Sequence, residues 1–95
     1  MIELKENELY QELDIYEGDV RIGTAEVEIK GRMISRLDIF EPYQNKGYGT
    51  QVVQMLCERY GCRCLWVNAD NERAIHTYEN CGFRKSAPTM YLMEI

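Results

Sequence analysis

A glycine-containing loop that precedes a segment of helical periodicity is the part of the sequence best suited to chemistry. The loop runs from Gln44 to Gly49 and contains Lys46 and Gly47. Because a helix N-terminus carries unpaired N–H groups and a partial positive charge, such a junction attracts phosphate. The two glycines lack side chains that would block close approach to the backbone. They would equally suit a loop that only needs positive φ angles, and the Walker and dinucleotide-binding patterns are absent from this segment.

Asn71 and Tyr78 form a second pair of candidate residues. At about 100° per residue, seven helical residues bring two side chains to within about 20° of each other, so both point to one side. A phenol with a reference pKa of about 10 can donate a proton at neutral pH. From spacing alone, Tyr78 also fits a buried apolar stripe. The single histidine, His76, falls about 140° from Asn71 and is expected to face solvent.

Alternating apolar and polar residues predict strands in the first forty residues. Strands are expected over residues 9–16, 20–29 and 33–40. The short turns between them favour an antiparallel meander. A change of parity near Gly23 indicates a β-bulge.

Helical spacing and short strands alternate in the second half of the chain. We expect the first helix to end at Gly61 and Asp70 to cap the second. This order predicts a single α+β domain over residues 1–95, with a mixed, mostly antiparallel sheet flanked by helices. The elements expected here are a helix over 49–60, a strand over 63–67, a helix over 71–81 and a strand over 90–95.

Two segments resemble motifs of the GNAT superfamily of acyl-CoA N-acetyltransferases. The stretch from Leu37 to Gly49 resembles the acyl-CoA-binding motif, whose core is Gln or Arg, two variable residues, Gly, one residue, and Gly or Ala. A second segment resembles the conserved block that follows this motif in the family. Its pattern is Asn71-x-x-Ala74-Ile75-x-x-Tyr78-x-x-x-Gly82-Phe83. The resemblance covers residues 33–83 and implies a GNAT-like fold, in a short member without the family's N-terminal helices.

The resemblance also implies a division of roles. Backbone N–H groups of the loop would bind the pyrophosphate of coenzyme A, assisted by Gln44 and Lys46. The strand edge at Ile39 and Phe40 would pair with the pantetheine arm, in a slot between two parallel strands that splay apart. Asn71 would contact pantetheine, and Tyr78 would protonate the departing thiolate. The loop residues concerned are Asn45, Lys46, Gly47, Tyr48, Gly49 and Thr50.

The acceptor side departs from the family in two respects. Glutamates that act as general base in relatives align with Met33 and Trp66, so Asp38 and Glu41 are the nearby substitutes, with water or an already neutral amine as alternatives. The chain also leaves no room for N-terminal helices, so this side is expected to be open or closed by a second subunit in a homodimer. Ten acids against five bases in residues 1–40 favour a basic or amine-bearing acceptor.

The function implied by the resemblance is that of an N-acetyltransferase. It would transfer the acetyl group of acetyl-CoA directly, without a metal, to an amine of a small molecule, peptide or protein. A non-catalytic acyl-CoA-binding or regulatory module is the alternative, because the family's acids and N-terminal helices are missing. A third possibility is an α/β interaction domain, which would not be stabilised by acetyl-CoA.

Composition excludes other classes of protein. The 95 residues are 45% apolar and 28% charged, as in globular domains. A net charge of −5 argues against nucleic-acid binding, and apolar runs of at most four residues argue against a membrane span. The first residues do not resemble a signal peptide, so a cytoplasmic location is expected. Structural thiols, rather than disulfides or zinc ligands, are expected at Cys57, Cys62, Cys64 and Cys81.

Overall fold

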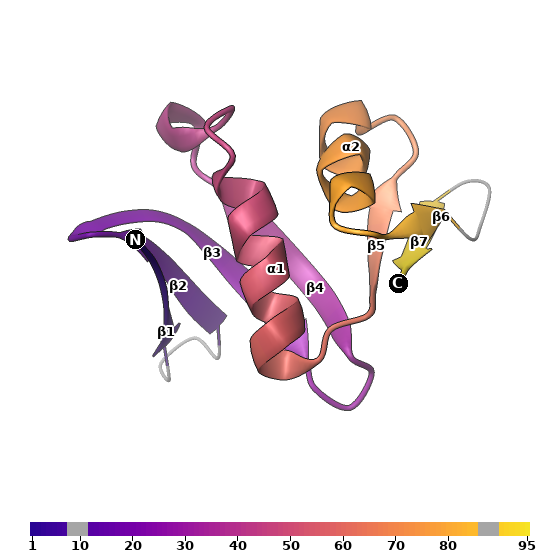
Figure 1. Cartoon of the computed structure of the whole chain (residues 1–95), viewed down its shortest axis with the longest axis horizontal. Coiled ribbons are helices and arrows are strands. Elements are labelled where there is room, and N and C mark those ends of the chain that lie inside the picture. The colour runs from indigo at the N-terminus through magenta and orange to yellow at the C-terminus, as the bar shows by residue number, and fades with distance from the viewer. Residues whose placement is uncertain (8–11, 86–89) are drawn as a thin grey trace.

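A mixed sheet and two α-helices account for most of the chain (Figure 1). The computed structural model describes residues 1–7, 12–85 and 90–95. In chain order the elements are β1 (Ile2–Asn7), β2 (Glu12–Glu17), β3 (Val20–Glu28), β4 (Met33–Ile39), the 3-10 helix η1 (Glu41–Tyr43), α1 (Tyr48–Tyr60), β5 (Cys64–Asn68), α2 (Glu72–Asn80), β6 (Arg84–Lys85) and β7 (Met90–Glu94).

The predicted antiparallel meander is confirmed for β2, β3 and β4. Strand β1 extends it by pairing with β2, and sequence patterning did not predict this strand although Ile2 and Leu4 alternate and are both buried. The two-residue strand β6 was also missed, because so short a segment has no periodicity. The predicted strand over residues 9–16 is confirmed from Glu12 onward, and its residues 9–11 lie outside the described residues.

The strands lie in the order β1-β2-β3-β4-β5-β7-β6, and the β4–β5 pair is parallel. These two strands pair at only two positions, Met33 with Cys64 and Ile34 with Leu65, and then part. The register between β3 and β4 shifts at the same point, which leaves Ser35 as an extra residue in β4. A bulge of this kind bends a strand. The slot that the family resemblance implied therefore lies between the carboxyl-terminal parts of β4 and β5.

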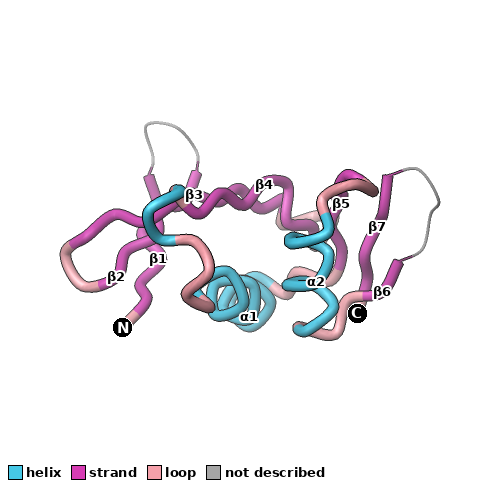
Figure 2. The backbone as a smooth tube through the Cα atoms, turned by 90° about the horizontal axis from the view of Figure 1, so that it is seen from above, coloured by secondary structure: helices cyan, strands magenta, loops and turns pink. Residues whose placement is uncertain are grey.

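Both α-helices cover the same face of the sheet (Figure 2). The apolar stripe of α1, formed by Val52, Val53 and Leu56, is fully buried against the strands. As predicted, α1 ends at Gly61, which adopts a left-handed conformation with φ 67°. The opposite face carries no helix among the described residues. No described helix has the length and apolar character needed to cross a membrane.

The cap of α2 differs from the prediction. Asn71, and not Asp70, is the N-cap residue, and its Oδ1 accepts a hydrogen bond from the Ala74 N–H at 3.3 Å. The turn after β5 continues through Asp70, so helical geometry begins one residue later than the pattern suggested. This position puts the side chain of Asn71 at the start of α2, where the helix faces the glycine-containing loop.

The backbone of β4 lies close to Gly23 of β3. The predicted bulge is confirmed beside it, at Ile22, because Ile15 pairs with Gly23 while Tyr16 pairs with Arg21. A Cβ atom on Gly23 would lie 2.2 Å from the backbone oxygen of Asp38. Only glycine therefore fits at this position without a movement of the strand that carries the slot.

Gly23→Ala is expected to destabilise the fold by roughly 1–3 kcal/mol, since the backbone of β4 must shift to accept the methyl group. Urea unfolding of the two proteins measures the difference. Gly31→Ala is the matched control, because a Cβ there meets only the flexible carboxylate of Glu28, at 3.0 Å. Equal losses of stability in the two variants would contradict the argument.

Candidate active site

A cleft of ≈ 380 Å³ lies between the loop before α1, the N-terminal half of α2 and the end of β4. Most of the residues predicted from the sequence line this cleft. They are Ile39, Gln44, Asn45, Gly47, Tyr48, Gly49, Thr50, Asn71 and Tyr78. Phe40 and Lys46 are not among the lining residues. The structure thus brings together two segments that are about thirty residues apart in sequence.

The loop enters α1 through two residues with left-handed backbone, Asn45 with φ 63° and Gly47 with φ 80°. Alternation of backbone handedness turns successive N–H groups toward one side, which forms a concave anion-binding surface. Gly47 is the N-cap of α1 and provides no capping side chain, and no acidic residue occupies the first turn. The N–H groups of Tyr48, Gly49 and Thr50 have no acceptor among the described residues. Unpaired N–H groups and the positive end of a helix therefore border the cleft.

At Ile39, the edge of β4 that faces the slot has no neighbouring strand among the described residues. The next residue, Phe40, donates its N–H to the Ile22 oxygen of β3 at 2.8 Å. Since successive residues of a strand direct their backbone groups to opposite sides, the N–H and C=O of Ile39 point away from β3 and toward the slot. Phe40 itself has its N–H bound to β3 and its ring against the guanidinium of Arg21, 5.3 Å from the ring centroid. Of the two residues predicted to pair with pantetheine, only Ile39 faces the slot.

The side chain of Gln44 connects three parts of the cleft. Its Nε2 donates to the Ile39 oxygen at 2.8 Å, and its Oε1 accepts from Nη1 of Arg73 at 2.7 Å. Gln44 therefore fixes the loop against β4 and α2, rather than extending toward a ligand. Arg73 lines the cleft and was missed from the sequence, because it lies about 200° around the helix from Asn71. The signal available was a basic residue in the first turn of a helix that faces the glycine-containing loop.

Tyr78 is buried at the inner end of the cleft, with 9% of its surface exposed. Its ring packs at a tilt of 59° on Phe83, with 6.2 Å between centroids. Burial raises the pKa of the phenol above its ordinary value, and the neighbouring Cys81 thiol raises the pKa further. No described residue forms a hydrogen bond with the hydroxyl. The phenol is thus protonated, fixed by packing and free to donate a proton to a group in the cleft.

Two of the remaining titratable candidates are placed outside the cleft. His76 is exposed on α2, as predicted, and Glu41 is exposed in η1. Asp38 is exposed and lines the cleft next to the slot. The carboxylate of Asp38 forms no ion pair with a described residue. Asp38 is therefore an acid without an ion pair to a described residue on the β4 side of the slot.

The four cysteines are free thiols. Burial raises the pKa of Cys62 to about 11 and raises the pKa values of the other three thiols, so all are protonated at neutral pH. Protonated thiols are poor nucleophiles and poor metal ligands. Within the ranges that the structure describes, no three His, Cys, Asp or Glu side chains converge as a metal site would require.

A helix N-terminus with unpaired N–H groups lies beside a gap between two parallel strands. Residues 2–83 match the sequence profile of the acetyltransferase (GNAT) family. The chain therefore belongs to the GNAT family of acetyltransferases. No curated protein sequence is significantly similar to the chain.

Solved structures of acetyltransferases share the fold. The spermidine N-acetyltransferase of Vibrio cholerae in complex with CoA and spermine superposes with a TM-score of 0.68 at 18% identity, over 90% of this chain and 64% of that one. An acetyltransferase of Thermus thermophilus has a TM-score of 0.64 at 23% identity, and the match covers 87% of this chain and 61% of that one. A protein of Pyrococcus horikoshii has a TM-score of 0.67 at 23% identity, and the match covers 86% of this chain and 62% of that one. The chain thus spans somewhat less than two thirds of the length of these proteins.

Proposed function

We propose that this domain transfers an acetyl group from acetyl-CoA directly to a primary amine. The observation that carries the proposal is the row of unpaired N–H groups at the start of α1, at one end of a cleft whose inner end holds the Tyr78 hydroxyl. A diphosphate fits the first feature, and a thiolate leaving group needs the second. Membership of the GNAT family supports both assignments.

In this proposal, binding of acetyl-CoA is divided between backbone and side chains. The N–H groups from Asn45 to Thr50 bind the pyrophosphate, and the guanidinium of Arg73 lies beside them as a cation that the sequence reasoning did not include. The N–H of Ile39, and its C=O beside the bond from Gln44, pair with the amides of the pantetheine arm, as an added strand would. The side-chain oxygen of Asn71 caps α2, so Asn71 contacts the arm through its amide nitrogen. This nitrogen donates no hydrogen bond to a described residue.

Acetyl-CoA supplies the acyl group as a thioester. The neutral amine nitrogen forms a bond to the carbonyl carbon, the carbon–sulfur bond breaks, and its electron pair stays on sulfur. Tyr78 gives its phenolic proton to that sulfur, and the proton that the nitrogen carries after bond formation passes to water or to Asp38. The products are an amide and the CoA thiol, and solvent returns a proton to the phenolate.

The acceptor in this proposal is a basic amine. The net charge of −5 favours a cationic acceptor, and the solved relative from Vibrio cholerae is a spermidine acetyltransferase. The acceptor side would be completed by solvent or by a second subunit, since no helix covers it among the described residues.

The experiment that tests the function has two stages. Acetyl-CoA at a hundredfold excess over its Kd is expected to stabilise the domain by about 2.7 kcal/mol, which raises its Tm by about 10 °C or more. Thiol release is then measured with a panel of alkylamines and basic peptides. An unchanged Tm would disprove the assignment, whereas a higher Tm with no turnover on any amine would favour a non-catalytic acyl-CoA-binding module, which the missing family acids also favour.

A further inference from the structure

We propose that Trp66, which lies on the helix-free face of the sheet beside the slot, binds a cationic alkylammonium group of the acceptor. The inference rests on the proposed acetyl transfer and specifies its substrate as an amine that carries a second positive charge. Two independent features lead to it: the position of Trp66 in β5 and the distribution of charge on the surrounding sheet.

Trp66 is a large apolar side chain exposed at the point where the sheet opens. It is the first residue of β5 beyond the last residue pair with β4, that of Ile34 with Leu65. Its neighbours Leu65 and Val67 are buried in the core that α1 and α2 cover. Since side chains alternate along a strand, Trp66 projects from the opposite face, and 50% of its surface is exposed.

The face of approach follows from the position of the cleft. The loop, α1 and α2 all lie on one side of the sheet, so coenzyme A would occupy that side (Figure 2). In this proposal, an acyl group that reaches the slot from there meets the amine on the opposite side. On that side, the exposed indole of Trp66 borders the opening.

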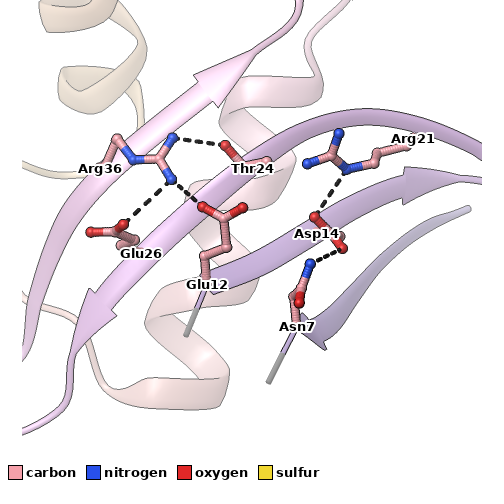
Figure 3. A network of polar contacts seen from close by, with 7 residues as sticks. All are labelled: Asn7, Glu12, Asp14, Arg21, Thr24, Glu26 and Arg36. Carbon is pink, nitrogen blue, oxygen red and sulfur yellow. Dashed lines mark hydrogen bonds and ion pairs between the residues drawn. The ribbon is translucent and has the colours of Figure 1, made fainter. Parts of the chain in front are cut away.

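Most of the charge on this face is compensated. Arg36 of β4 binds the carboxylates of Glu12 and Glu26 and donates to the Thr24 hydroxyl at 2.8 Å (Figure 3). Asp14 accepts from Arg21 at 3.0 Å and from Asn7 at 3.1 Å. These contacts form a cross-strand polar network in which every carboxylate has a donor.

Asp38 lies outside this network. It stands between the half-buried Leu37 and Ile39 of β4, so its side chain projects to the same face as that of Trp66. Its carboxylate has no ion pair or hydrogen bond with a described residue. An indole face attracts an ammonium group electrostatically, and a free carboxylate beside the same opening adds to the attraction. The opening is thus bordered by the two groups that bind a cationic amine.

Steady-state kinetics test the proposal with two acceptors of equal length. Trp66→Ala is expected to raise KM for 1,4-diaminobutane roughly fivefold, as loss of a cation–π contact at a half-exposed site predicts. KM for acetyl-CoA should not change, and Trp66→Phe should retain most of the affinity. For 4-amino-1-butanol, whose tail is neutral, the same variant should show a much smaller increase in KM. Ile29→Ala removes a 67% exposed side chain in the turn that follows β3 and is the matched control.

A second measurement does not depend on turnover. Trp66 is the only tryptophan of the chain, so its fluorescence reports directly on this position. Titration with tetramethylammonium, which cannot be acetylated, is expected to change the emission saturably, and Asp38→Asn should weaken the effect. An unchanged KM for the diamine in Trp66→Ala, or an emission insensitive to tetramethylammonium, would overturn the proposal while acetyl transfer stands. No turnover with any amine would instead overturn the proposed function.

Discussion

Replacement of Tyr78 by phenylalanine is expected to lower kcat for acetyl transfer by about 100-fold and to leave the affinity for acetyl-CoA unchanged. The change removes only the proton donor, whose contribution in general acid catalysis is at least of this size. Phenylalanine preserves the packing on Phe83, and the hydroxyl has no partner among the described residues, so the fold keeps its stability. Because burial raises the pKa of the phenol above about 10, Tyr78 stays protonated at neutral pH and loses its proton only at higher pH.

Thiol release measures kcat, and calorimetric titration with acetyl-CoA measures affinity. Tyr60→Phe is the matched control, since Tyr60 ends α1 and its hydroxyl lies 3.5 Å from the Glu6 carboxylate, outside the cleft. Equal rates for the parent protein and Tyr78→Phe would remove Tyr78 from the mechanism and leave it as a core aromatic. In the parent protein, a decline in rate that begins well below pH 10 would have to come from another group.

The second large effect is expected from Gly47→Ala, which should weaken coenzyme A binding roughly tenfold or more. Gly47 has φ 80°, where a residue with a Cβ is strained by about 1–2 kcal/mol. Relaxation of this strain rotates the peptide groups that direct the N–H groups of α1 toward the cleft. Loss of one charge-assisted hydrogen bond to a phosphate accounts for a factor of this size.

Gly18→Ala separates the effect on binding from the effect on stability. Gly18 lies in the turn between β2 and β3, also has a positive φ of 60°, and a Cβ on either glycine meets no atom within 4 Å. Both variants should therefore lose similar amounts of stability in urea unfolding. Only Gly47→Ala should lose affinity for coenzyme A in calorimetric titration. Equal affinities in the two variants would show that the loop before α1 does not bind the diphosphate.

The elements that sequence patterning predicted correctly are those with several turns or several alternations. The stripe of α1 and the meander of β2, β3 and β4 each repeat a period often enough to be recognised. Strand β6 has two residues, and the start of α2 depends on which of two adjacent polar residues meets the Ala74 N–H. Local hydrogen-bond geometry decides such ends, and periodicity carries no information about it.

The composition of the site was predictable and its internal contacts were not. The glycine-containing loop and Tyr78 converge on one cleft, as the order of the two motifs implied. The Gln44 side chain binds Ile39 and Arg73, and the N–H of Phe40 binds β3. These details depend on which side of β4 each backbone group faces, which follows from the register with β3. A bulge shifts that register, and its consequences become visible only in three dimensions.

The pairing of β4 with β5 is the weakest connection between neighbouring long strands of the sheet. Two residue pairs join the sheet section built from β1 to β4 to the section built from β5 to β7. An extended molecule lying between the two strands would supply hydrogen-bond partners where β4 and β5 are unpaired, and would join the two sections into a stiffer unit. Substrate would then be a structural component of the working protein, and product release would restore the looser arrangement.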